Sequence, residues 1–194
     1  MPVPHQLNVE KFSYADYLTW PDDERWEIID GVAYNMSPAP NVRHQRVSGR
    51  LFRKIANHLD GKQCETFVAP FDVRLSERTG LTDEKIETVV QPDILVICDN
   101  SKLDERGCNG APDLVIEITS PHTSKNDLTV KFELYQRHGV KEYWIVHPVE
   151  QTLLVYRLDE SGKFSSHDRY TTDDKVPVAL LGDLVVNLAE VFAE

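Results

Sequence analysis

The chain has 194 residues, which is enough for one domain with a sizeable core but too short for two domains of ordinary size. Lys and Arg number 21 against 32 Asp and Glu, and the net charge of −11 argues against a protein that coats nucleic acid over its whole surface. No apolar run approaches the roughly 18 residues needed to span a bilayer, and the N-terminus lacks the pattern of a secretion signal. We therefore expect one cytoplasmic domain over residues 1–194, without a membrane partner.

The cysteines predict no covalent framework. Cys64, Cys98 and Cys108 are odd in number and far apart, unlike a disulfide scaffold or a closely spaced zinc knuckle. We expect three reduced thiols.

The first third of the chain predicts a short helix, a hairpin and a long helix. The short helix covers residues 13–18, and the hairpin covers residues 26–36 with its turn at Asp30-Gly31. Asn41 is a suitable cap for a helix that runs to about Leu59 and ends at Gly61.

The long helix combines an inward face with a basic row. At about 100° per residue, one face collects several apolar side chains together with two histidines: His44, Val47, Leu51, Ile55 and His58. Beside it lies a row of arginines: Arg43, Arg46, Arg50 and Arg53. Residues 43–62 carry six positive residues against one negative residue in an otherwise acidic chain, so the row is our candidate DNA-backbone surface. The alternative is an ordinary solvated helix face.

The middle of the chain predicts strands that lead into a crossover. The expected strands cover residues 65–68, 71–75, 94–98, 114–118 and 142–146. The polar stretch 76–87 is expected to be a loop or hairpin tip, and the polar stretch 99–111 is expected to be a connection. The strands at 94–98 and 114–118 are almost continuously apolar, which is typical of a sheet covered on both faces. A Ser/Thr/Pro-rich turn at 119–124 precedes a helix over residues 125–138 that stops at Gly139.

The C-terminal part predicts further strands at residues 152–158 and 163–170 and a final apolar segment at 176–192. Because a strand, a helix and a strand follow one another in the middle of the chain, we expect an α/β fold with a central mixed sheet flanked by helices.

Glu117 is the anomaly in the apolar strand 114–118, because burying a carboxylate without a partner is costly. A divalent metal ion is the simplest partner, and it would normally require a second carboxylate. Asp113 lies about 13 Å away along the same strand, which is too far to share one ion. Asp93 follows Pro92 at the entry of the neighbouring strand and can point into a cleft. For Asp93 a salt bridge or loop cap is an equal alternative, whereas for Glu117 the apolar neighbours favour function.

Lys131 is the third candidate. It lies three residues after Leu128 and four before Tyr135, which puts its stem on the helix face that packs against the sheet. The alternative is a surface ion pair with Asp127. Since the helix starts shortly after the Glu117 strand and packs back over its carboxyl end, the ammonium can reach inward. Two carboxylates, a metal ion and an ammonium are the minimal set for hydrolysing a phosphodiester.

At these positions the sequence resembles a known family, the Uma-type "putative restriction endonuclease" family of the PD-(D/E)XK nuclease superfamily. The resemblance covers most of the chain and is strongest from Gln91 to Pro148. The motifs that carry it are Gln91-Pro92-Asp93-Ile94, Ala111-Pro112-Asp113 with the strand that follows up to Pro121, Asp127, Lys131, Tyr135, residues 139–146, and in the first half residues 26–31 and His44.

The resemblance implies a restriction-endonuclease-like core with Asp93, Glu117 and Lys131 as catalytic residues. The superfamily pattern has a lysine two residues after the glutamate, where this chain has Thr119. In Uma-type sequences the lysine lies on the following helix, and Lys131 is the matching position. The carbonyl of Ile118 would be a metal ligand in addition to Asp93 and Glu117.

Four residues are expected to support the site: Glu27, His44, Asp113 and Tyr135. His44 lies one turn into its helix, where a hydrogen-bonded core histidine is the commoner outcome. Glu27 is suited to a water-mediated metal contact, and an exposed hairpin face is an equal alternative.

The sequence thus predicts a Mg²⁺-dependent or Mn²⁺-dependent endonuclease acting on DNA. In it, Lys131 would position or deprotonate water and steady the charge of the phosphate. Nucleases of this type often act as dimers, so the resemblance also suggests a homodimer. The alternatives are a non-catalytic nucleic-acid-binding or interaction module with an inherited nuclease fold, and a hydrolase of another phosphoester.

Overall fold

A six-stranded mixed sheet forms the centre of the molecule. The structure is a computed structural model that describes residues 11–21, 24–36, 41–78, 80–119 and 127–193. In this part of the chain the strand order of the main sheet is β12-β11-β10-β9-β6-β3, and β9 and β10 are its parallel pair. The strands are β3 (Glu65–Val68), β6 (Ile94–Ile97), β9 (Leu114–Ile118), β10 (Glu142–His147), β11 (Thr152–Arg157) and β12 (His167–Thr171).

A second six-stranded sheet lies beside the main one and is built from short strands. Its order among the described residues is β2-β1-β5-β4-β8-β7. These strands are β1 (Trp26–Ile29), β2 (Val32–Asn35), β4 (Val73–Arg74), β5 (Val89–Val90), β7 (Leu103–Asp104) and β8 (Gly107–Asn109). A separate two-stranded sheet pairs β13 (Lys175–Pro177) with β14 (Val185–Asn187).

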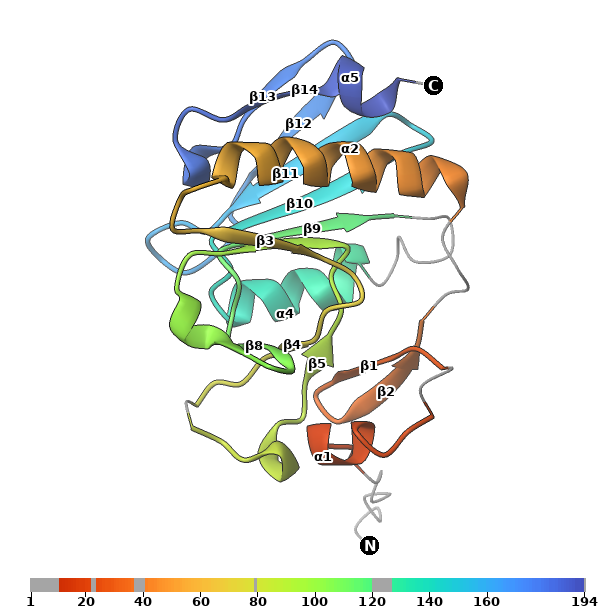
Figure 1. Cartoon of the computed structure of the whole chain (residues 1–194), viewed down its shortest axis with the longest axis vertical. Helices are drawn as coiled ribbons and strands as arrows, with labels where there is room; N and C mark the ends of the chain where they lie inside the picture. Colours follow the sequence, from red (N-terminus) through yellow and green to blue (C-terminus); the bar gives the residue numbers. More distant parts are fainter. Residues whose placement is uncertain (1–10, 22–23, 37–40, 79, 120–126, 194) are drawn as a thin grey trace, which may run out of the picture.

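Helices cover the main sheet on both faces. Figure 1 shows α2 (Val42–Leu59) along one face, below β13, β14 and α5 (Leu188–Phe192), and α4 (Phe132–Arg137) along the other face. The second sheet and α1 (Tyr14–Tyr17) lie beyond α4. The remaining helical segments are η1 (Asp83–Lys85), η2 (Asn100–Lys102), η3 (Asp127–Lys131, a π-helix) and η4 (Ala179–Leu181). This arrangement agrees with the predicted α/β fold and its central mixed sheet.

Local sequence signals place the first elements where the sequence predicted them. Asn41 accepts a hydrogen bond from the backbone N–H of His44 and so caps α2, which ends at Leu59. The β1–β2 hairpin turns at Asp30 and Gly31, whose φ angles of 52° and 83° are both positive. Two positive φ angles are typical of the tight turn that matches strand twist, and this explains the Asp-Gly pair.

The alternation of β9 sorts its side chains between two cores. Ile116 and its even-numbered neighbours pack with α2 and the C-terminal strands, whereas Val115 packs with α4 and the second sheet. Glu117 has the same parity as Val115 and therefore faces α4. Because both faces are covered, β9 is buried along its whole length, as its continuous apolar run predicted.

The segment predicted as one helix over residues 125–138 contains a π-helical turn before its α-helix. Residues 120–126, with the predicted turn, lie outside the described residues, and residues 127–131 form one wide π-helical turn before α4. Single π-helical turns inside helices often occur at functional sites, and here the turn ends at Lys131. Gly139, with a φ of 78°, follows the helix as predicted.

The polar stretches at 76–87 and 99–111 contain more structure than the sequence predicted. The first contains η1, and the second contains η2, β7 and β8. Strands of two or three residues are too short to show an alternating pattern, and their hydrogen-bond partners come from distant parts of the chain.

The prediction of three reduced thiols was wrong, because Cys64 and Cys98 form a disulfide. The antiparallel register of β3 and β6 pairs Glu65 with Ile97, and its continuation places the two cysteines opposite each other. Sequence spacing gave no sign of this pair because strand register is a tertiary property. Cys108 is a free thiol as predicted, and burial raises its pKa to about 12.

Within the described residues, no helix is both long enough and apolar enough to cross a membrane.

Ile116 tests the packing of the main sheet against α2. Its side chain is fully buried, so Ile116→Ala should lower the free energy of unfolding by about 2–5 kcal/mol through lost burial and a cavity. Urea unfolding followed by circular dichroism measures this loss. Val149→Ala, at a position 60% exposed, is the control and should change stability by less than about 0.5 kcal/mol. Equal stability of both variants would contradict the assigned core.

Candidate active site

The candidate site lies where β9 and β10 end, next to the start of α2 and to η3. Antiparallel β6 and β9 pair Ile94 with Ile116, so the continuation of this register sets Asp93 opposite Glu117. Asp93 lies just before the first residue of β6, and its side chain reaches the end of β9. Two carboxylates that lie 24 positions apart in the sequence are thereby brought to one end of the sheet.

Asp93 is held by the neighbouring strand and by α2. Its Oδ2 atom accepts a hydrogen bond of 2.7 Å from the backbone N–H of Ile118. The same oxygen lies 3.3 Å from Nε2 of His44, one turn into α2. His44 thus faces the site, and the Asp93 side chain remains about one-quarter exposed, which makes it the accessible carboxylate of the pair.

Glu117 is buried and holds two donors from the following helical segments. Its Oε1 atom lies 3.0 Å from Nζ of Lys131 and accepts a hydrogen bond of 2.7 Å from the hydroxyl of Tyr135. Lys131 and Tyr135 lie four positions apart, which places them on the same side of the helix. The lysine therefore reaches inward, as the sequence predicted. The alternative was a surface ion pair with Asp127, whose side chain lies outside the described part of the chain.

Glu27 joins the same network from the second sheet. Nζ of Lys131 lies 2.9 Å from Oε1 of Glu27, and that oxygen also accepts a hydrogen bond of 2.8 Å from the backbone N–H of Gln91. The predicted alternative of an exposed hairpin face is wrong for Glu27, because the residue is only 6% exposed. One ammonium thus bridges two buried carboxylates from two different sheets.

Lys131 is the ammonium that the buried carboxylates of this cluster share. Glu27 and Glu117 lie 2.9 Å and 3.0 Å from the Lys131 ammonium, and Asp93, which lies near His44, adds a third carboxylate at the same end of the sheet. Burial, Glu117 and Glu27 raise the pKa of Tyr135 well above its usual value, so its hydroxyl stays protonated and donates. A divalent cation bound here would add positive charge beside these carboxylates.

A divalent cation fits this donor set. Within the described part of the chain, no three His, Cys, Asp or Glu side chains converge as a complete metal cage. Mg²⁺ needs none, because it is commonly held by one or two carboxylates and keeps several water molecules or substrate oxygens. Asp93 and Glu117 carry carboxylate oxygens, which are hard donors, at the end of the sheet next to the peptide of Ile118.

Asp113 does not belong to the site. It lies before the opposite end of β9, where its carboxylate accepts a hydrogen bond from the backbone N–H of Cys98 and pairs with Lys141 at 2.6 Å. The reason is the geometry anticipated from the sequence: four residues along a strand separate Asp113 from Glu117 by about 13 Å. Its role as a supporting residue is therefore corrected to a structural ion pair.

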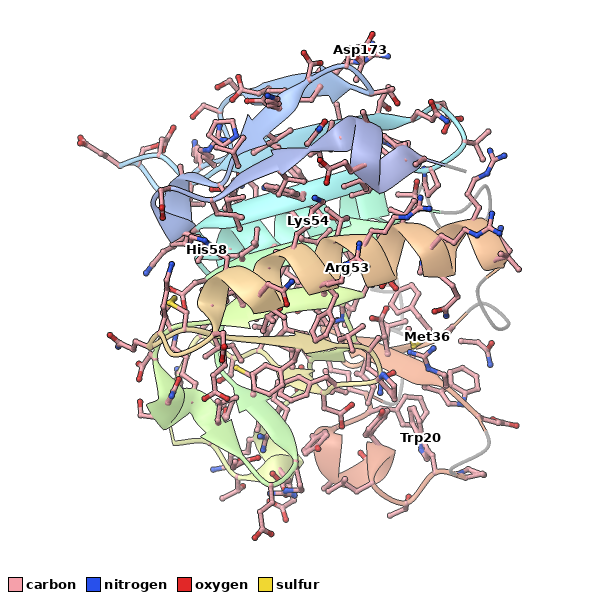
Figure 2. All side chains as sticks on the ribbon, turned by 45° about the horizontal axis from the view of Figure 1, so that its top comes forward. Trp20, Met36, Arg53, Lys54, His58 and Asp173 are labelled. Atoms are coloured by element: carbon pink, nitrogen blue, oxygen red, sulfur yellow. A yellow bond between two sulfur atoms is a disulfide. The ribbon has the colours of Figure 1, made fainter. Side chains whose placement is uncertain are left out.

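The arginine row is only partly available to a ligand. Arg43, Arg46 and Arg53 are exposed on α2, whereas Arg50 donates to the backbone carbonyls of Val191 and Ala193 in the C-terminal segment. Figure 2 shows Arg53 and Lys54 towards the middle of α2. The part of the row nearest the site is therefore Arg43 and Arg46, which flank His44.

His147 was not singled out from the sequence. It is the last residue of β10, and the parallel register pairs Ile145 with Glu117 and so sets His147 beside Thr119. Nδ1 of His147 lies 2.9 Å from Oγ1 of Thr119, the residue at the usual lysine position. The signal in the sequence was a histidine at the end of a strand parallel to β9, because parallel strands end at the same edge.

The fold defines a mixed α/β protein with a carboxylate cluster at one end of its main sheet, and comparisons with known proteins identify its family. The family model Uma2, described as "Putative restriction endonuclease", matches residues 14–189, and the chain therefore belongs to this family. An uncharacterized protein of Synechocystis sp. is 28% identical over 180 residues, which cover 89% of this chain and 87% of that protein.

The fold is also similar to a crystal structure from Anabaena variabilis that is described as a "putative nuclease belonging to DUF820". The TM-score is 0.74 and the identity 22%, with 94% of this chain and 98% of the other covered. This likeness shows the fold, which is the nuclease-like core predicted from the sequence.

The pH dependence of stability tests the burial of His147. Burial, and to a lesser degree Arg169, lower its pKa below 6.5 against an opposing effect of Glu150. The unfolded chain thus takes up a proton first, so stability falls as the pH drops from about 6.5 to the folded pKa. His147→Gln should lose less stability than the wild type between pH 7.5 and pH 5.5, as measured by urea unfolding. His167→Gln, at an exposed site on β12, is the control. Identical losses of stability in the wild type and both variants would contradict the lowered pKa of His147.

Proposed function

We propose that the protein is a metal-dependent endonuclease that hydrolyses phosphodiester bonds in DNA. The observation that carries this proposal is the contact of 3.0 Å between Lys131 Nζ and Glu117 Oε1. It places an ammonium beside the buried carboxylate although the usual lysine position is occupied by Thr119. Family membership supports the same reaction class.

Each side chain of the cluster has a role that follows from its contacts. Asp93, Glu117 and the carbonyl of Ile118 would hold the divalent cation, Mg²⁺ or Mn²⁺. When bound, the cation supplies neutralisation of phosphate charge and lowers the pKa of a bound water molecule. Lys131 orients the Glu117 carboxylate and presents positive charge where the phosphate becomes more negative. Glu27 and Tyr135 are positioning residues, because they act through Lys131 and Glu117.

The partners of Asp93 suit a site that opens to solvent. The bond from the Ile118 N–H fixes one oxygen of Asp93, and His44 approaches that same oxygen. Arg43 and Arg46 are exposed on either side of His44, so a phosphate backbone crossing the start of α2 would meet positive charge next to the carboxylates. Contacts of this kind would position DNA without reading its sequence.

The cleavage test compares three variants on single-stranded and double-stranded DNA, with Mg²⁺ and with EDTA. Glu117→Gln and Lys131→Ala should each lower the Mg²⁺-dependent cleavage rate by at least about a hundredfold, because each removes charge from the reacting centre. Asp113→Asn is the matched control: it alters an equally buried carboxylate before the far end of β9 and should keep the rate.

Thermal melting of every variant separates lost chemistry from lost folding. Lys131→Ala leaves two buried carboxylates without this partner and should also cost stability, about 3–5 kcal/mol. Glu117→Gln keeps the shape of the side chain and is the decisive variant. Equal cleavage by wild type and folded Glu117→Gln, or no cleavage by the wild type with any DNA, would contradict the proposal and favour a non-catalytic module.

The arginines predict the salt dependence of DNA binding. In the Glu117→Gln background, replacing Arg43 and Arg46 by Gln should reduce the slope of log K against log salt by roughly one to two, through loss of phosphate contacts. Fluorescence anisotropy of labelled DNA at several salt concentrations gives the slope. Lys163→Gln with Lys175→Gln removes two exposed charges elsewhere and should leave the slope unchanged. An unchanged slope in the first double variant would exclude this surface as a backbone contact.

A further inference from the structure

A large hollow next to the candidate site has no part in the chemistry described so far. It has a volume of about 610 Å³, within the range of small-molecule sites. Its walls come from α1 and the turn after it, the start of β1, the segment before β4, and the β7–β8 turn. Figure 2 shows Trp20, one of its lining residues, beside α1 and apart from Arg53 on α2.

Aromatic side chains dominate one side of the hollow. Tyr17, Trp20, Trp26 and Phe71 line it, and all four are only partly buried. The ring centroids of Trp20 and Trp26 are 5.7 Å apart at 71°, and those of Tyr17 and Trp20 are 5.7 Å apart at 62°. Partly exposed rings set at steep angles offer flat faces to a planar ligand.

A buried glutamine fixes the polar side of the hollow. The amide of Gln91 donates from Nε2 to Asp72 at 2.9 Å and to the Tyr17 hydroxyl at 3.1 Å. Its Oε1 atom accepts from Nη2 of Arg25 at 2.8 Å and from Nε at 3.3 Å. Gln91 is only 9% exposed, so the guanidinium plane of Arg25 and the carboxylate of Asp72 are oriented before any ligand arrives.

The hollow and the carboxylate cluster share a wall. Trp26 lines the hollow, and the next residue in β1, Glu27, lies within the cluster because side chains alternate along a strand. Gln91 lines the hollow with its side chain while its backbone N–H donates to Glu27 at 2.8 Å. Asp93 follows two residues later. A ligand in the hollow would therefore be separated from the carboxylate cluster by the backbone of β1 and of Gln91.

The charge of the hollow indicates which part of a nucleic acid it suits. Its lining carries four carboxylates, on Glu24, Asp72, Asp104 and Glu105, against two arginines, so a phosphate would be repelled. A nucleobase is neutral and planar. It stacks on aromatic rings and on guanidinium planes, and its amino groups donate to carboxylates.

We propose that this hollow binds an unpaired nucleobase of the DNA strand that is cut. The choice of occupant rests on the function proposed above, whereas the hollow itself does not. A base inside a duplex cannot reach such a pocket without leaving the stack, so single-stranded or locally unpaired DNA is the preferred substrate. Duplex DNA would bind more weakly by the cost of unstacking.

Tryptophan fluorescence tests the proposal without cleavage. Of the three tryptophans, Trp20 and Trp26 line the hollow and Trp144 is fully buried in the core, so a ligand in the hollow should quench the first two. The probe is a short single-stranded oligodeoxynucleotide added to Glu117→Gln protein in EDTA. The same oligonucleotide with abasic sites, and a duplex of the same sequence, are the comparison ligands.

The expected result is quenching by the single strand and little quenching by the abasic strand. By fluorescence anisotropy of the labelled strand, Trp26→Ala and Phe71→Ala should each weaken binding by roughly 5-fold to 150-fold, the cost of losing one stacked base. Tyr170→Ala, on β12 at the far edge of the main sheet, is the aromatic control and should bind as before. Equal binding of abasic and normal strands would overturn the proposal. Aromatic rings also bind organic cations, so quenching by tetramethylammonium ion but not by the single strand would overturn it as well.

The outcomes separate this inference from the proposed nuclease. Binding that depends on the bases and on Trp26, in a protein that cuts no DNA, would support the hollow and reject the nuclease. Mg²⁺-dependent cleavage at equal rates by wild type, Trp26→Ala and Phe71→Ala, without quenching, would support the nuclease and reject the hollow as a base pocket.

Discussion

The bridge formed by Lys131 between Glu117 and Glu27 is the interaction on which the candidate site depends. The ammonium lies 3.0 Å from one carboxylate and 2.9 Å from the other, and all three residues are nearly inaccessible to water. Ionised groups remain at such depth only when each charge is compensated by a close partner. The bridge therefore couples the main sheet, the π-helical turn and the second sheet, and it fixes the edge at which Asp93 is presented.

The position of Lys131 illustrates that the proposed catalytic pattern depends on geometry and not on spacing along one strand. In the general superfamily pattern the lysine follows the glutamate on the same strand, whereas here Thr119 holds that position and contacts His147. The helical crossover from β9 to β10 returns over the end of the strand and delivers the ammonium from another element. A pattern read along one strand would miss it, yet the charge reaches the same carboxylate.

The two sheets contribute different side chains to the candidate site and to the hollow. The main sheet, covered by α2 and α4, gives the rigid edge that carries Asp93 and Glu117. The second sheet contributes Glu27 to the cluster and, one residue earlier, Trp26 to the aromatic hollow. The groups proposed for chemistry and those proposed to recognise an unpaired base would thus lie on the two sides of β1, because successive side chains of a strand point to opposite sides.

The sequence by itself determined the elements with strong local signals. The cap at Asn41, the Asp-Gly turn and the continuous apolar run around Glu117 correctly placed α2, the first hairpin and β9. These features depend on residues near one another in the chain, so their periodicity and turn chemistry are visible without coordinates. Glu117 stood out for the same reason, as an acid surrounded by apolar neighbours.

Only the tertiary structure decided which distant residues meet. It paired Cys64 with Cys98, assigned Asp113 to Lys141, built the second sheet from strands of two to four residues, and brought Gln91 and Trp26 to one hollow. Strand register and the packing of one sheet beside another arise from contacts between segments far apart in the chain. Local propensity carries no information about such contacts, which is why the site could be named in part but not assembled from the sequence.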